Sequence, residues 1–139
     1  MSWIDQTDMI ASIRDAKLTQ MIDGDAVVLE NAVDAAVGTV TDYLCGRYDV
    51  AGIFAATGTA RPNNVLRWVK HIALWYLYER LPDAMTPKKV EKNYDEVIEF
   101  LGEVSAGRVS VNLPHKPDPK DASQPLTKFR FGFKPKRDL

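Results

Sequence analysis

The residues of this sequence best suited to catalysis are His71, His115 and Cys45. A catalytic site needs groups with complementary roles, such as a nucleophile beside its base, and the sequence places no such partner near any of the three. His71 lies within an apolar stretch, so we expect a partly buried structural histidine. His115 is flanked by Pro114 and Lys116 and is expected to be solvated. Cys45 lies near a predicted helix C-terminus, where the helix dipole disfavours a thiolate, and is expected to be a small packing residue. We predict no catalytic site and no enzyme.

Metal and cofactor sites are not predicted either. One cysteine and two distant histidines are too few for a structural zinc site. The aspartates of residues 5–25 lack the alternating spacing of a calcium-binding EF-hand loop. The glycines of residues 52–58 lack the Gly-Lys-Ser/Thr ending of a phosphate-binding loop.

Arg47 and four aromatic residues are the candidates for packing within or between subunits. We expect them in a subunit interface or in the core: Arg47, Tyr48, Trp68, Trp75 and Tyr78. Arg47 either pairs with carboxylates and locks the loop that follows it, or is a surface residue favoured at a helix C-terminus. The aromatic residues exceed what a small core needs, and such a surplus indicates assembly with other subunits.

A second candidate surface lies near the C-terminus, where aromatic residues alternate with basic or small ones. In an extended chain Phe129, Phe131 and Phe133 lie on one face. The residues predicted to bind a partner are Lys128, Phe129, Arg130, Phe131, Phe133, Lys134, Lys136 and Arg137. The surrounding composition is rich in proline and charge and cannot order by itself, so we expect a flexible arm that orders on binding. A mobile, solubilising tail is the alternative.

The elements that must position these residues belong to one small soluble domain. The chain has 139 residues, of which 45% are hydrophobic and 27% charged, an ordinary globular composition. No apolar run approaches the roughly 18 residues that cross a bilayer, and the N-terminus lacks a signal-peptide pattern. We expect a protein that stays inside the cell that makes it.

Charge divides the chain into an acidic body and a basic arm. Residues 1–113 contain 11 Lys and Arg against 16 Asp and Glu, a net charge of −5, whereas residues 114–139 contain 7 against 3, a net charge of +4. An acidic body is a poor surface for nucleic acid, while a basic arm suits an acidic partner. We therefore predict a helical domain over 1–113 and a proline-rich basic arm over 114–139.

Apolar residues that recur every three or four positions predict a mainly α-helical bundle. We expect one broken helix or two short ones over 7–23, and longer helices over about 26–46, 62–81 and 86–107. Thr7 and Thr86 are the expected N-caps of two of them, and Gly24, Gly46 and Gly107 the expected terminators. Pro62 and Pro87 suit the first turns of the helices that they begin.

Two stretches lack helical periodicity. Residues 49–63 contain two glycines and a proline, so a loop over the core is expected, with Ile53 and Phe54 partly buried. Residues 108–113 alternate apolar and polar side chains, which predicts a short strand or an extended segment.

The order of these elements is similar to that of a known family. The helix that ends in Leu44-x-Gly46-Arg47-Tyr48, the segment Ile72-Ala73-x-x-x-Leu77-Tyr78 and the final Gly107 resemble the Mu-like bacteriophage neck family, whose members are head-completion or head-to-tail adaptor proteins. The resemblance covers about residues 3–113.

This resemblance implies a structural protein of the virion neck, assembled in the host bacterial cytoplasm. Its copies would form a dodecameric ring beneath the portal protein, extend the DNA channel and offer a platform to the next neck or tail-terminator protein. DNA would pass without sequence-specific binding, and neither a membrane nor a cofactor is implied. The alternative is a small helical nucleic-acid-binding regulator that uses the basic tail, and a steep fall of DNA affinity with salt would favour it.

Overall fold

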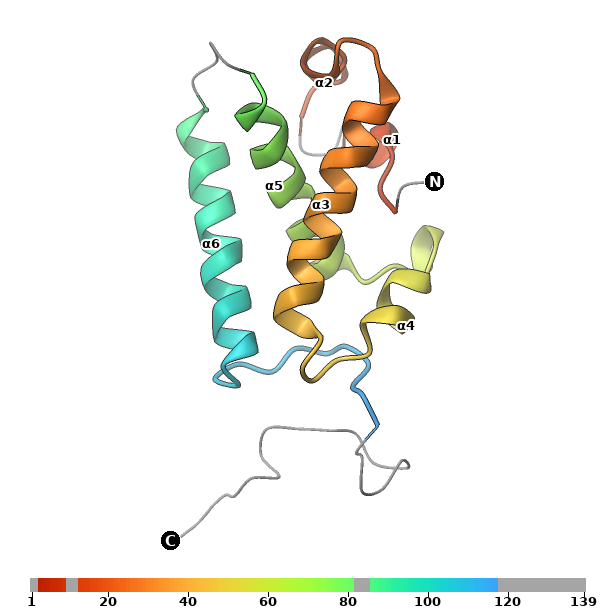
Figure 1. Cartoon of the computed structure of the whole chain (residues 1–139), viewed down its shortest axis with the longest axis vertical. Helices are drawn as coiled ribbons and strands as arrows, with labels where there is room; N and C mark the ends of the chain where they lie inside the picture. The colour runs from red at the N-terminus through yellow and green to blue at the C-terminus, as the bar shows by residue number, and fades with distance from the viewer. Residues whose placement is uncertain (1–2, 10–12, 82–85, 118–139) are drawn as a thin grey trace, which may run out of the picture.

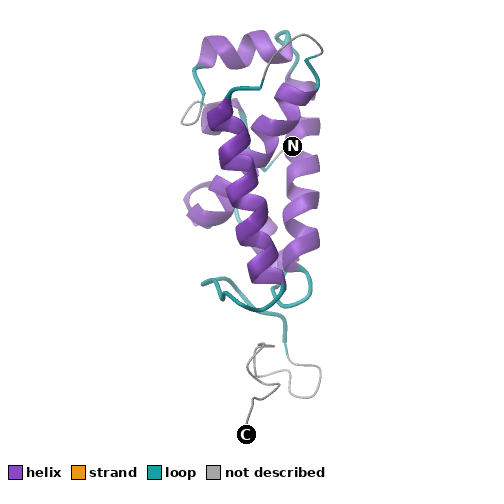
Figure 2. Ribbon diagram, turned by 90° about the vertical axis from the view of Figure 1, so that its left-hand side faces the viewer, coloured by secondary structure: helices purple, strands orange, loops and turns teal. Residues whose placement is uncertain are grey.

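A computed structural model of the chain describes residues 3–9, 13–81 and 86–117. In these residues the chain forms helices and no strand, so the predicted mainly α fold is confirmed (Figures 1 and 2). The helices are α1 (Gln6–Met9), α2 (Asp15–Ile22), α3 (Ala26–Leu44), α4 (Val50–Ala55), α5 (Asn63–Glu79) and α6 (Lys88–Ser105), with a 3-10 turn, η1 (Gly58–Ala60), before α5. None of them is long and apolar enough to cross a membrane.

The three long helices α3, α5 and α6 form an antiparallel bundle that encloses the core, running down, up and down in Figure 1. The stripes predicted from the sequence face inward: Val33 and Val40 of α3, Ile72 and Leu77 of α5 and Leu101 of α6 are fully buried. Each such side chain contributes about 1.5–3 kcal/mol on burial before the loss of chain entropy is counted. The bundle is therefore the main source of stability.

The small elements lie around this bundle. Helix α2 covers its upper end, while α1 and α4 lie against α3 on the side away from α6 (Figure 1). They add buried side chains to the same core, among them Met9, Leu18, Ile22 and Ile53. The short helices α1 and α2 also resolve the alternative left open for residues 7–23 in favour of two helices.

The helices begin near the predicted positions, but two of the predicted N-cap residues differ from those observed. Thr7 lies inside α1, because Asp5 and Asp8 cap this helix reciprocally: the Asp8 N–H donates to the Asp5 carboxylate at 2.9 Å, and the Asp5 N–H to the Asp8 carboxylate at 3.1 Å. Helices α5 and α6 begin directly after a proline, which occupies the N-cap position. The predicted cap at Thr86 was therefore wrong by one residue.

Residues 49–63, predicted as a loop, contain helix α4. The Asp49 carboxylate accepts a hydrogen bond from the Gly52 N–H at 3.1 Å and caps the helix. This six-residue helix places Ile53 in the core, where it is 1% exposed, and leaves Phe54 half-buried. The helix is too short to show a periodic pattern, and its glycine suggested a loop.

Residues 108–113 form no strand. They turn beneath the end of α6, where the Val109 N–H donates to the Glu103 carbonyl and the Leu113 N–H to the Val111 carbonyl. An isolated bridge joins Tyr48 to His115 in antiparallel sense. The extended backbone that pairs with another segment is thus at His115, after the predicted segment 108–113.

Candidate partner-binding surfaces

The base of the C-terminal arm is hydrogen-bonded to the body. The Asp49 N–H donates to the Pro114 carbonyl at 2.8 Å, and the Lys116 N–H donates to the Arg47 carbonyl at 3.0 Å. Both contacts join the turn after α3 to residues that the sequence assigned to the arm. The direction in which the chain leaves the body is therefore fixed as far as residue 117.

Tyr48 is the side chain on which this junction is built. It is 2% exposed, and its hydroxyl accepts a hydrogen bond from the Val111 N–H at 3.1 Å. The imidazole of His115 packs on its ring, with centroids 4.7 Å apart. The prediction that His115 is solvated was wrong, because the antiparallel bridge places the histidine directly against Tyr48.

Arg47 binds the C-terminus of a helix other than its own. Its guanidinium Nη1 donates to the Val104 carbonyl at 3.2 Å and to the Ser105 carbonyl at 3.0 Å, both in the last turn of α6. The favourable charge-dipole interaction is the one expected of a cation at a helix C-terminus. No carboxylate among the described residues pairs with Arg47.

Gly107 explains how the Arg47 side chain fits there. The glycine has φ +83°, and a Cβ at this position would lie 2.8 Å from Nη2 of Arg47. Two sequence markers that are sixty residues apart, Arg47 and Gly107, are therefore parts of one contact.

The aromatic candidates divide between core and surface. Trp68 is 1% exposed and Tyr78 is 7% exposed, so both lie in the core of the body, and their presence gives no support to a subunit interface. Trp75 is half-buried and stacks on Tyr94, with ring centroids 4.7 Å apart and planes at 16°. Of these three candidates, Trp75 retains an exposed aromatic edge.

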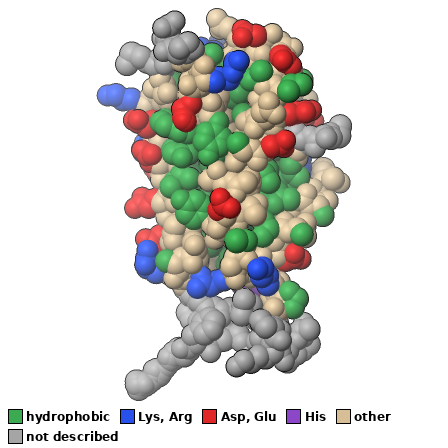
Figure 3. All heavy atoms as spheres, viewed as in Figure 1, with side chains coloured by type: hydrophobic (Ala, Val, Ile, Leu, Met, Phe, Trp, Pro, Cys, Tyr) green, Lys and Arg blue, Asp and Glu red, His purple; other side chains and the backbone are tan. Residues whose placement is uncertain are grey.

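Trp75 belongs to a surface that we call the aromatic strip, formed by Tyr43, Trp75, Tyr76 and Tyr94. All four side chains are half-buried, and the Tyr76 and Thr39 hydroxyls are hydrogen-bonded at 2.7 Å. Burial, followed by the nearby Tyr76 hydroxyl and Glu79 carboxylate, raises the pKa of Tyr94. Apolar side chains gather on the face of the molecule made by α3 and α6, between acidic residues (Figure 3).

A groove of about 610 Å³ lies between α1, α3 and α4, and we call it the α1–α3–α4 groove. Apolar side chains from Trp3, Ile4, Leu29, Val37 and Phe54 line its floor, and Asp5, Glu30 and Asp34 are its acidic lining residues outside the ion pair described next. Its chemistry is that of a site for a segment with apolar and basic side chains.

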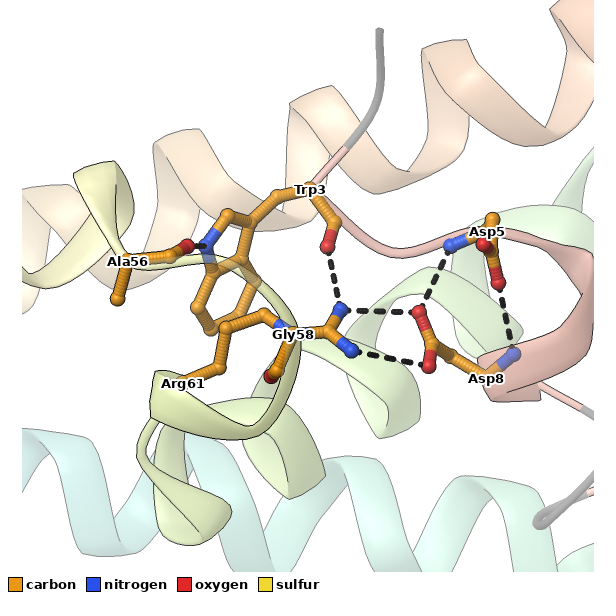
Figure 4. Close-up of polar contacts among 6 residues, drawn as sticks. All are labelled: Trp3, Asp5, Asp8, Ala56, Gly58 and Arg61. Atoms are coloured by element: carbon orange, nitrogen blue, oxygen red, sulfur yellow. Dashed lines mark hydrogen bonds and ion pairs between the residues drawn. The ribbon is translucent and has the colours of Figure 1, made fainter.

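Arg61 lines this groove and forms a cluster of polar contacts beside it (Figure 4). Its guanidinium forms a two-pronged ion pair with the Asp8 carboxylate at 2.9 and 3.1 Å and donates to the Trp3 carbonyl at 2.7 Å, while Nε donates to the Gly58 carbonyl at 2.8 Å. The hydrogen bonds from Arg61 hold the pKa of Asp8 below its ordinary value, and Asp8 in turn raises the pKa of Arg61.

Trp3 lines the groove as well. Its indole N–H donates to the Ala56 carbonyl at 3.0 Å (Figure 4). Its ring meets the Phe54 ring edge to face, with centroids 4.8 Å apart. Sequence reasoning missed this groove altogether, because residues 3–8 and 54–61 converge only in the folded chain.

Two of the residues considered for catalysis belong to different segments of the body, His71 to the middle of α5 and Cys45 to the end of α3. His71 is half-buried, as predicted, and burial, followed by the charge of Arg67, lowers its pKa. Cys45 is exposed, so its predicted packing role was wrong: it follows Leu44, which faces the core, by about 100° around the helix. Within the described part of the chain, no group of three or more His, Cys, Asp or Glu could hold a metal ion.

The eight residues predicted to bind a partner through the arm, from Lys128 to Arg137, lie outside the described residues.

These surfaces belong to a mainly α protein with a bundle of three long helices and a C-terminal segment anchored at one end of it. Residues 3–128 match the family described as Bacteriophage Mu, Gp36, and the chain belongs to this family. It is therefore a Mu-like bacteriophage protein, of a family of phage structural and morphogenesis proteins. The match continues beyond the body and ends directly before Phe129. None of the curated proteins matches the chain.

Proposed function

We propose that the chain is a head-to-tail connector adaptor of the phage neck. Copies of it dock beneath the portal protein as a dodecameric ring, extend the DNA channel and present a platform to the next neck or tail-terminator protein. The observation that carries this proposal is the junction at Tyr48, which anchors a basic arm to one end of a rigid helical body. Membership of the Mu Gp36 family supports it.

The body supplies the subunit of the ring. The acidic balance of residues 1–113 keeps a channel wall from gripping DNA, so DNA passes without sequence-specific binding. The side chains of the aromatic strip are half-buried, and aromatic residues are enriched in protein interfaces. We assign it to contacts between neighbouring copies.

The arm supplies the contact with the portal. Phe129, Phe131 and Phe133 anchor in an apolar groove or add a strand to a sheet edge of the portal. The basic residues around them, Lys128, Arg130, Lys134, Lys136 and Arg137, meet acidic residues at the rim of that site. The arm loses conformational entropy when it binds the portal, and this loss weakens the contact. Each single contact therefore stays reversible until the ring is complete.

Co-sedimentation with capsids that carry the portal but lack this protein tests the arm. A chain truncated after Pro117 keeps the hydrogen bonds of Pro114 and Lys116, so its helical circular dichroism should equal that of the full chain, while its capture by the capsids should be lost. A full-length variant with Phe129, Phe131 and Phe133 changed to Ser should behave like the truncation. Capture equal to that of the unmodified chain by either variant would contradict the role of the arm.

Salt titration of DNA binding separates this function from that of a nucleic-acid-binding regulator. An adaptor of this kind should bind double-stranded DNA weakly and without sequence preference at low salt. Tight binding that falls steeply with salt, and that the truncation after Pro117 removes, would favour the regulator.

A further inference from the structure

The α1–α3–α4 groove and the last part of the arm have opposite chemistries. The groove has an apolar floor and an acidic lining, and the arm segment from Lys128 to Lys134 alternates phenylalanines with three basic residues and one glycine. We propose that residues 128–134 occupy the α1–α3–α4 groove of their own chain before the protein joins an assembly. This docking is an addition to the adaptor function and does not depend on it.

Helix α3 supplies the wall that would recognise the segment. Ala26, Glu30, Asp34 and Val37 recur at intervals of four, four and three residues, and Leu29 lies beside Glu30, so these residues form one stripe of α3 that lines the groove. The stripe is apolar along one edge, where Leu29 is 4% exposed and Val37 is half-buried, and acidic along the other. When the phenylalanines of an extended segment face the apolar edge, Lys128 and Arg130 leave its opposite face, and their long side chains reach the acidic edge by bending around the backbone.

The acidic edge lacks a cationic partner within the described part of the chain. Glu30 and Asp34 are exposed, form no ion pair there, and stand four residues apart on the helix. Two like charges at this spacing destabilise a helix slightly. Lys128 and Arg130 beside them would remove this repulsion. Arg61, the one cation that lines the groove, is already paired with Asp8.

The apolar floor also fits the segment. Side chains two positions apart in an extended chain are separated by about 6.6 Å on one face, so three phenylalanines span about 13 Å. The stretch of α3 from Ala26 to Val37 that lines the groove is about 17 Å long. The groove therefore has room for all three rings along its length.

The connection is long enough for docking within one chain. The twelve steps from Pro117 to Phe129 span at most about 40 Å when extended. The arm leaves the body near the C-terminal end of α3, and the whole helix is about 28 Å long. A tethered segment that reaches its site has an effective concentration near the millimolar range, far above that of a second copy in dilute solution. Docking in the same chain is therefore favoured over exchange between copies.

Photo-cross-linking of the full chain tests this proposal. The variant Phe131→p-benzoyl-phenylalanine keeps an aromatic ring in the arm and is irradiated at low micromolar concentration. The expected product runs as a monomer in a denaturing gel, and mass spectrometry maps the cross-links to Leu29, Val37, Phe54 and their immediate neighbours. Cross-links scattered over the body, or confined to a dimer band, would overturn the proposal.

Charge reversal supplies the matched control. Glu30→Lys with Asp34→Lys should lower the groove cross-link about tenfold, because two attractive contacts become repulsive. Asp95→Lys with Glu99→Lys reverses an equally exposed acidic pair, also four residues apart, on α6, and should leave the yield unchanged. Adding Lys128→Glu and Arg130→Glu to the groove variant should restore the cross-link. Equal losses from both reversals, with unchanged circular dichroism, would refute recognition by the groove.

The two proposals fail separately. The cross-link is measured on the isolated chain, whereas the adaptor function is measured by capture on capsids. Loss of the cross-link with normal capture would remove only docking within the chain, and the reverse result would remove only the role of the arm at the portal.

Discussion

The bundle of α3, α5 and α6 and the small elements around it are stabilised in different ways. The bundle depends on many fully buried apolar side chains distributed over three helices. The small elements add a few buried residues, and single arginines that donate to backbone carbonyls hold two of these elements and the turn after α3 in place. Arg47 reaches Val104, Arg61 reaches Trp3 and Arg80 reaches Met21, over 57, 58 and 59 residues respectively.

Substitutions in the bundle are therefore expected to act on the whole domain, and substitutions of the arginines on single segments. Loss of one apolar contact in the bundle weakens a core shared by every helix, so the whole domain becomes less stable. Loss of one arginine leaves backbone carbonyls near the surface, where water can replace the lost hydrogen bonds, so the cost is smaller. The segment that the arginine held then opens more readily than the rest of the chain. The comparison therefore predicts large, cooperative effects for the bundle and smaller, regional effects for the arginines.

The largest effect is expected from Leu77→Ala. Leu77 is fully buried in α5, so the substitution should lower the free energy of unfolding by about 2–5 kcal/mol through lost burial and a residual cavity. Urea unfolding followed by circular dichroism and by tryptophan fluorescence should shift together. Val27→Ala is the control, because Val27 is 56% exposed and should change stability by less than about 0.5 kcal/mol. A similar loss in both variants would contradict the assigned core.

The next effect is expected from Arg61→Gln. It removes the ion pair with Asp8 and the bond to the Trp3 carbonyl, and should lower the free energy of unfolding by about 1–3 kcal/mol. Hydrogen exchange should accelerate in α1 and at Ala56, and much less in α5 and α6. Arg67, which is exposed and forms no ion pair with another described residue, supplies the control Arg67→Gln. Equal acceleration throughout the chain would show that Arg61 acts on the whole fold.

A smaller effect is expected from Arg47→Gln. The contact caps the last turn of α6 and is more exposed, so about 0.5–1.5 kcal/mol is expected, with faster exchange confined to residues 104–116. Arg47→Lys keeps the charge and loses the fork of donors, and should fall between the two. Unchanged exchange in this region would contradict the role of Arg47 at the base of the arm.

The smallest effect is a pH dependence that comes from His71. Burial lowers its folded-state pKa below the ordinary 6.5, so the unfolded chain binds the proton more tightly. Stability should therefore decrease as pH falls from about 6.5 toward the lowered pKa and change no further, through this group, below it. His71→Gln should flatten this part of the stability profile measured by thermal unfolding. An unchanged slope would assign the titration to another group.

The long helices were predictable from the sequence because their signal is local. Residues 26–46 and 86–107 carry apolar side chains at helical spacing, and the observed α3 and α6 agree within two residues at each end. Helix α4 was missed because six residues are too few to show a period, and the carboxylate of Asp49 that caps it looks like any loop aspartate.

The contacts that shape the candidate surfaces were not predictable in this way. Arg47 was singled out, but its partners at the end of α6 lie 57 and 58 residues away, and no local pattern connects them. The same holds for Arg61 with Trp3 and Asp8, which all line the groove. Trp68 was assigned to a surplus of aromatic residues, yet it continues the buried stripe of Val65, Val69 and Ile72 at helical spacing. The helical spacing of that stripe therefore predicts the burial of Trp68 better than the number of aromatic residues does.

Electron microscopy of assembled particles tests the adaptor function most directly. The map should show helical density that fits the α3, α5 and α6 bundle in a ring between the portal and the tail, with a connection from the Tyr48 junction toward the portal. Particles that are complete without this density, or density for the bundle elsewhere in the virion, would contradict it.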